Sequence, residues 1–139
     1  MKPTEALPLV ESTLQRMTDL YGATMFDEWA VIRTRPVASV AHYSGPRADG
    51  FRDSFSRDFA PLQQETTDRS YAVGDFDFAR AAAGTNFDAL LRLGPEALLI
   101  CNNTKLSMAE IRANPQWLKA QVPFLELSEQ FRASPLKFE

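Results

Sequence analysis

The first element that the hydrophobic pattern predicts is an amphipathic helix beginning near Pro8 and ending at Gly22. Its apolar positions recur every three or four residues, which is the spacing of one helix face. Proline suits the first turn of a helix, and glycine suits the position just past its end. The apolar positions are Val10, Leu14, Met17 and Tyr21.

Two strands follow, over Phe26–Arg33 and Val37–Tyr43. The first is rich in aromatic and branched residues, and the second alternates between apolar and small or polar residues. Arg35-Pro36 between them favours a tight reversal, so we expect an antiparallel hairpin. Strict alternation would place His42 on the same face as Ala38 and Val40.

A second helix is predicted over 51–62, after the breaker Ser44-Gly45-Pro46. Its apolar residues are spaced by four, four and three positions, and charged residues occupy the other faces. This is the spacing of a helix with one buried stripe. The stripe consists of Phe51, Phe55, Phe59 and Leu62.

Three more strands are expected over Tyr71–Arg80, Phe87–Leu93 and Ala97–Asn102. Gly94-Pro95-Glu96 joins the last two as a second hairpin. The last strand is almost entirely apolar, as is typical of a strand covered on both faces. We therefore expect it at the centre of the sheet, with helices on each side.

Residues 105–139 are predicted to be helical but broken by prolines. Ser107 and Glu110 form a capping-box pattern. Asn114 followed by proline restarts the helix, and Pro123 kinks or restarts it again. The packing of these pieces does not follow from the pattern.

The predicted order of elements is α-β-β-α-β-β-β-α. It indicates an α+β fold in which a five-stranded antiparallel sheet carries helices on both faces. The 139 residues fit a single domain spanning 1–139, with 45% hydrophobic and 24% charged residues, both ordinary for a globular protein.

Charge and cysteine content narrow the class of protein. Fifteen basic residues stand against eighteen acidic ones, and the basic residues form no cluster. Nucleic-acid and anionic-membrane binders rely on such clusters, so we expect neither partner. The single cysteine, Cys101, lies in an apolar run and excludes an internal disulfide. A cytoplasmic location follows as an expectation.

Four polar residues are candidates for a site, although no phosphate loop, dinucleotide motif or metal-ligand spacing accompanies them. His42 is the only histidine, and Asn102 ends a strand before a loop. Asp75 and Asp77 lie on one strand face about 7 Å apart, where they could hold a cation or act as acid and base. No cofactor is expected.

The layout resembles the roadblock/dynein light chain superfamily, of the profilin-like kind. The segments FDEWAVIRTRPVASVAHYSG, GFRDSFSRDFAPLQQ and YAVGDFDFARAAAGTNFDALLRLGPEALLICNN stand where that family has its first hairpin, central helix and last three strands. The broken C-terminal segment departs from the family's single final helix. The resemblance implies terminal helices on one face of the sheet and the central helix on the other.

The resemblance also implies a homodimer that pairs the central helices and third strands of two copies. Such proteins are not enzymes but scaffolds or regulators, often of small Ras-like GTPases. The dimer contact would then involve five aromatic residues, with core packing as the alternative role for the helical ones. They are Phe51, Phe55, Phe59, Phe76 and Phe78.

Two other functions stay open. One is a small-molecule sensor domain of PAS-like type, with an aromatic-lined pocket and His42 or Asn102 as polar anchor. The other is an enzyme that uses Asp75 and Asp77. The face of strand 71–80 that is buried also stays open, because a slip of one residue exchanges the two faces.

Overall fold

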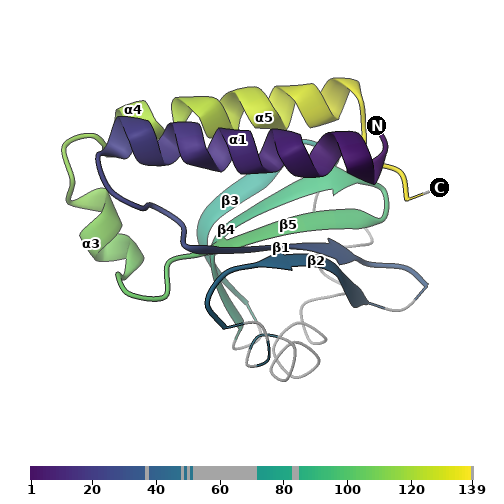
Figure 1. Ribbon diagram of the computed structural model, residues 1–139, viewed down its shortest axis with the longest axis horizontal. Coiled ribbons are helices and arrows are strands. Elements are labelled where there is room, and N and C mark those ends of the chain that lie inside the picture. The colour runs from purple at the N-terminus through teal and green to yellow at the C-terminus, as the bar shows by residue number, and fades with distance from the viewer. Residues whose placement is uncertain (37, 48, 50, 52–71, 83–84, 139) are drawn as a thin grey trace.

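The computed structural model contains an antiparallel five-stranded sheet with helices, which confirms the α+β class (Figure 1). It describes residues 1–36, 38–47, 49, 51, 72–82 and 85–138. The strands lie in the order β2-β1-β5-β4-β3. Their bounds are β1 Glu28–Arg33, β2 Ser39–Ser44, β3 Phe76–Ala82, β4 Thr85–Gly94 and β5 Ala97–Asn102.

β5 occupies the centre of the sheet, as its apolar sequence predicts. It pairs with β1 on one side and β4 on the other, and its residues 97–101 are all buried. Because apolar side chains on both faces of a strand gain from burial only when both faces are covered, this sequence is suited to the central position.

The described helices are α1 Pro3–Tyr21, α3 Met108–Arg112, α4 Trp117–Ala120 and α5 Val122–Ala133. Figure 1 shows α1 and α5 side by side over one face of the sheet. The main core lies between these helices and that face, and the predicted stripe of α1 faces into it. Among its fully buried members are Val10, Met17, Leu91, Leu99, Phe124 and Phe131.

The first helix begins at Pro3, five residues before the predicted start. Pro3 occupies the first turn, and the carboxylate of Glu5 accepts a hydrogen bond of 3.4 Å from the Lys2 amide. Pro8 lies inside the helix, where it cannot donate to the carbonyl of Thr4. Thr4 and Pro8 are both exposed, so water can reach the Thr4 carbonyl. The predicted end at Gly22 is confirmed, with φ 88°.

The C-terminal segment consists of three helices, with breaks where the prolines and caps predict them. Ser107 and Glu110 form the predicted capping box, with hydrogen bonds of 3.2 Å in both directions. The next helix, α4, begins at Trp117 rather than directly after Asn114, whose side chain caps the intervening turn. Pro123 is the second residue of α5, where a missing N–H costs nothing.

The opposite face of the sheet has a smaller apolar cluster. Phe51 joins it, is 7% exposed and lies 5.0 Å from the ring of Tyr43. The rest of the predicted central helix, including Phe55 and Phe59, falls outside the described residues. The sheet residues of the cluster are Ala30, Ile32, Leu90, Leu98 and Ile100.

A bulge in β2 overturns the predicted facing of His42. Val31 pairs with His42 but Ile32 pairs with Val40, so Ala41 is an extra residue in the strand. The bulge puts Val40 against the smaller cluster and His42 on the opposite face, where its ring lies 4.9 Å from that of Trp29.

β3 begins at Phe76, five residues later than predicted. Residues 72–75 form a turn in which the Asp75 amide donates to the Ala72 carbonyl at 3.0 Å. Gly74 in this turn has φ 92°, which a strand does not accommodate.

Candidate functional site

Glu28, at the start of β1, is the buried centre of a polar cluster whose other members are partly exposed. Its side chain is completely buried, and Arg47 binds it through two nitrogens at 2.9 and 2.7 Å. The hydroxyl of Tyr43 donates to it at 2.7 Å, and the amide of Asn102 donates at 3.1 Å. The cluster thus ties β1, β2, β5 and residue 47 together.

The hydrogen bonds decide the charge state of Glu28. Burial alone would raise its pKa, but the bonds from Arg47, Tyr43 and Asn102 and the charge of Arg47 outweigh burial and hold the pKa below its usual value. Burial and the bond to Glu28 raise the pKa of Tyr43 to about 12. Glu28 is therefore an anion that only accepts hydrogen bonds, and Tyr43 is a neutral donor.

A second set of carboxylates fixes the loop after β5. Asp88 accepts from the Asn103 amide at 2.6 Å, and Asp27 accepts from the amide and hydroxyl of Thr104 at 2.9 and 2.6 Å. Burial, followed by the charges of Asp27 and Glu28, raises the pKa of Asp88 above its usual value in spite of the bond from Asn103. Asp88 and Asp27 thus fix the loop after β5 by accepting hydrogen bonds from its backbone amides.

The sequence pattern identified Asn102 as a candidate site residue but did not identify the residues that its side chain contacts. Asn102 uses its amide on Glu28 and its carbonyl oxygen on the amide of Asp88, at 3.2 Å. Glu28 is the one charged residue within the otherwise apolar run EWAVI of β1, which is the signal that could have identified it. Arg47 follows a Gly-Pro pair and has no comparable signal.

His42 and Asn102 lie on opposite faces of the sheet. His42 contacts Trp29 on the face that carries α1 and α5. Asn102 lies on the other face, beside its cross-strand partner Glu28. The two residues therefore do not converge on a common pocket, and the sensor alternative would have to use one of them alone.

Asp75 and Asp77 have different surroundings. Asp75 caps the turn before β3 by accepting from the Ala72 amide at 2.9 Å, and its carboxylate lies 3.7 Å from Arg132 of α5. Asp77 is half-buried within β3, paired with Leu90. Within the described ranges, no group of three or more His, Cys, Asp or Glu residues could hold a metal ion.

Phe76 and Phe78 of β3 face the helices. Their rings are 5.7 Å apart, and each lies near that of Phe124 in α5, at 5.6 and 5.2 Å. Trp117 of α4 lies 5.1 Å from Phe78. The face of β3 that carries Phe76 and Phe78 is therefore the one that packs against the helices. Both phenylalanines remain half-buried, as members of an aromatic cluster beside the end of the sheet.

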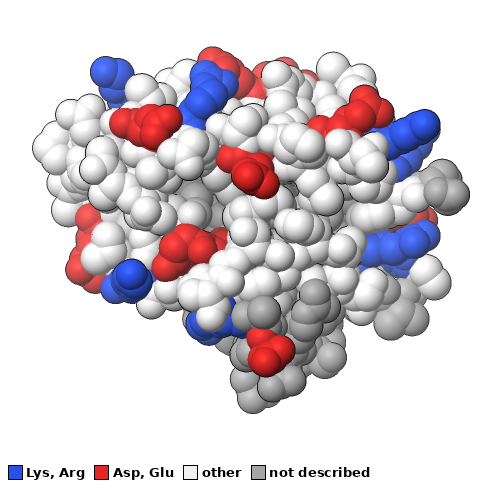
Figure 2. Space-filling model, in the orientation of Figure 1, with Lys and Arg blue, Asp and Glu red and all other residues white. Residues whose placement is uncertain are grey.

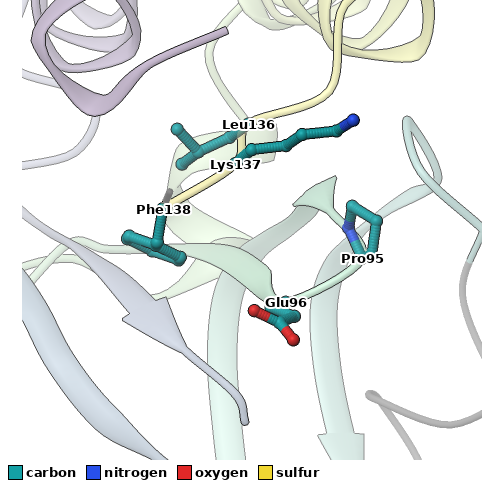
Figure 3. Close-up of a pocket in the computed structure, with 5 residues that line it drawn as sticks. All are labelled: Pro95, Glu96, Leu136, Lys137 and Phe138. Atoms are coloured by element: carbon teal, nitrogen blue, oxygen red, sulfur yellow. The ribbon is translucent and has the colours of Figure 1, made fainter.

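A pocket of about 240 Å³ lies between the C-terminal tail and the β4–β5 turn. Figure 3 shows Leu136, Lys137 and Phe138 of the tail across from Pro95 and Glu96 of the turn. The Leu136 amide holds the tail in place by donating to the Leu93 carbonyl at 2.8 Å. The lining includes none of the predicted site residues.

The charges on the face seen in Figure 2 are mixed in sign, and neither sign forms a continuous patch there. In the part of the chain that the structure describes, no helix has the length and hydropathy to cross a membrane.

Comparison of the chain with protein families, with curated proteins and with solved structures found no match.

Proposed function

We propose that the chain is a non-catalytic interaction module that works as a homodimer, with the outer edge of β3 as the contact between two copies. The observation that carries this proposal is a difference between the two edge strands of the sheet, β2 and β3. The edge strand β2 has a bulge within its length, whereas the pairing of the other edge strand, β3, is regular from Phe76 to Ala82.

The pairing of β3 with β4 keeps one register from Phe76↔Leu91 to Ala82↔Thr85. Directly before this stretch, the Arg92 amide donates to the Asp75 carbonyl at 2.9 Å and the Arg92 carbonyl accepts from the Gly74 amide at 2.9 Å, so Gly74 and Asp75 together oppose Arg92 as a bulge. The Asp75 carbonyl points to β4, and because backbone groups alternate in direction along a regular antiparallel strand, those of Phe76, Phe78 and Arg80 point to the outer edge.

Edge strands usually carry a feature that blocks further pairing, such as a bulge, a proline or charged side chains, lysine above all. β2 has its bulge at Ala41. The β3 sequence FDFARAA contains neither proline nor lysine, its two charged residues, Asp77 and Arg80, are of opposite sign, and its register contains no shift between Phe76 and Ala82. This edge is therefore suited to pairing with a second strand, and a second copy of β3 offers the same regular edge.

The non-catalytic part of the proposal is supported by what the candidate polar residues do. Glu28, Asn102, Asp75 and Asp88 each hold a loop or strand end through hydrogen bonds to other parts of the chain. Groups occupied in this way are positioned for stability rather than for proton transfer to a substrate.

The roadblock-like assignment belongs to the same proposal, and it is supported by both terminal helices lying on one face of the antiparallel sheet. It implies a cytoplasmic scaffold or regulator with a small Ras-like GTPase as partner. That part is tested by titrating the protein with such GTPases in their GDP and GTP-analogue states. Absence of binding in both states would contradict the GTPase role.

The dimer contact is tested with one proline at each end of the sheet. Arg80→Pro removes an N–H that points to the open edge of β3, and Val40→Pro is the matched change on β2, where the alternation also turns the N–H outward. We expect sedimentation equilibrium to show a monomer for Arg80→Pro and a dimer for Val40→Pro. Circular dichroism checks that both variants are folded. A folded Arg80→Pro dimer would contradict the proposal.

A further inference from the structure

Three large apolar side chains lie exposed along α4 and the start of α5. Leu118 is 78% exposed, and Val122 and Leu125 are each 45% exposed. Their spacing of four and three residues places them on one side of the helical segment, and we call them the outer stripe. The other apolar stripe of this segment, formed by Phe124, Leu127 and Phe131, is completely buried.

The helices that carry the outer stripe contact β3 and the turn before it. Ser128, one turn after Leu125, donates its hydroxyl to the Gly74 carbonyl in the turn before β3. Arg132, a further turn along, lies 3.7 Å from Asp75 in the same turn. At the other end of the stripe, Trp117 contacts Phe78 of β3. The helices that carry the stripe therefore run beside β3.

We propose that the outer stripe packs against the same stripe of a second copy when two β3 edges pair. This inference rests on the proposed dimer and names its second contact. A two-fold axis perpendicular to the joined sheet keeps the helices of both copies on the same face. α5 packs on β4, and its Phe124 reaches Phe76 and Phe78 of β3. Because adjacent strands are about 4.8 Å apart, α4 and α5 of the two copies would be neighbours across the axis.

The size of the contact also requires more than the strands. The seven residues of β3 span about 23 Å, and with a sheet thickness of about 10 Å the paired edge covers roughly 230 Å². A stable interface covers roughly 800 Å² on each partner. Apolar surface next to the strand has to supply much of the difference, and the outer stripe is exposed apolar surface in that position.

The stripe has the chemistry of a two-fold contact. Residues near a two-fold axis meet their own copies, so a charged residue there would face a like charge. Leu118, Val122 and Leu125 carry no charge. Of the charged residues that follow the stripe, Glu126 pairs with Arg16 of α1 at 3.1 Å, and Glu129 forms an ion pair with Arg132 within α5.

The test compares Leu118→Glu and Leu125→Glu with Leu106→Glu. Leu106 is a matched control because it is an exposed leucine, at 37%, that lies in the loop before α3 and outside the outer stripe. All three positions are exposed, so the fold should survive, which circular dichroism checks. Sedimentation equilibrium over a concentration series gives the Kd of the dimer for each protein.

We expect each stripe variant to raise the dimer Kd about 100-fold, because symmetry puts two new carboxylates into one contact, and Leu106→Glu to leave it within about twofold. If the wild type and the stripe variants all dimerise equally well while Arg80→Pro is a monomer, the stripe proposal is wrong and the β3 dimer stands. A monomeric wild type overturns both.

Discussion

Glu28 and Arg47 form a bidentate ion pair whose two members differ completely in exposure. The Glu28 side chain is inaccessible to solvent, whereas that of Arg47 is 52% exposed. Without the ion pair, Glu28 would be a buried charge with no cation beside it, whereas water could still solvate Arg47. This asymmetry decides which of the two can be removed at lower cost in stability.

Replacing Arg47 by methionine should destabilise the protein more than replacing Glu28 by glutamine. The first change leaves a buried carboxylate without its cation and should cost roughly 2–3 kcal/mol. The second leaves a cation that water can reach and should cost about 1 kcal/mol. Urea unfolding at pH 7 measures both. Equal costs, or the reverse order, would contradict the asymmetry.

Acid should remove the contribution of Glu28 to stability. Its pKa in the folded state lies below the usual 4.5, and such a carboxyl stabilises the fold above its unfolded pKa and loses that effect as pH falls through the folded pKa. The free energy of unfolding of wild type minus that of Glu28→Gln should be constant above pH 4.5 and shrink below it. A difference that grows on acidification would contradict this assignment.

Asp88 should behave in the opposite way. Burial raises its pKa, so its ionised form opposes folding, and protonation relieves that cost as pH falls. Asp88→Asn keeps an oxygen that can accept from the Asn103 amide. Thermal melts should show the variant more stable than wild type at pH 7, with the advantage lost below the usual pKa of 3.8. Lower stability of the variant at pH 7 would show that its charge is needed.

Gly94 should tolerate no side chain while the C-terminal tail is in place. A Cβ at this position would collide with the backbone carbonyl of Leu136, which cannot move without releasing the tail. Gly94→Ala should cost about 1–3 kcal/mol and increase hydrogen exchange at Leu136, whose amide is bonded to β4.

Gly22→Ala is the control for Gly94→Ala. No atom lies near its added Cβ, but φ is 88°, so only backbone strain of about 1 kcal/mol applies and exchange at Leu136 should not change. Unchanged exchange at Leu136 in Gly94→Ala would contradict the contact.

Local patterns predicted the fold class and much of the element order. The apolar run of β5 fixed its central place because burial of both faces leaves few alternatives, and the Ser107–Glu110 capping box needs only residues three apart. The ends of elements were less predictable at proline and glycine. Pro8 was expected in the first turn of a helix but lies inside α1, and Gly74 was expected within a strand but lies in the turn before β3.

The features that depend on distant residues could not be predicted. The extra residue at Ala41 follows from the register of β1 against β2, and it reverses the face of His42. The cluster around Glu28 joins residues up to 74 positions apart. The facing of Phe76 and Phe78 depends on where α5 lies. In each case the deciding partner lies on another element.

The most direct test of the proposed function is the mass of the wild-type protein by light scattering after size exclusion, over a series of concentrations. A homodimer built on β3 predicts a mass near twice 15.6 kDa across the micromolar range. A mass of 15.6 kDa at every concentration would contradict the proposal.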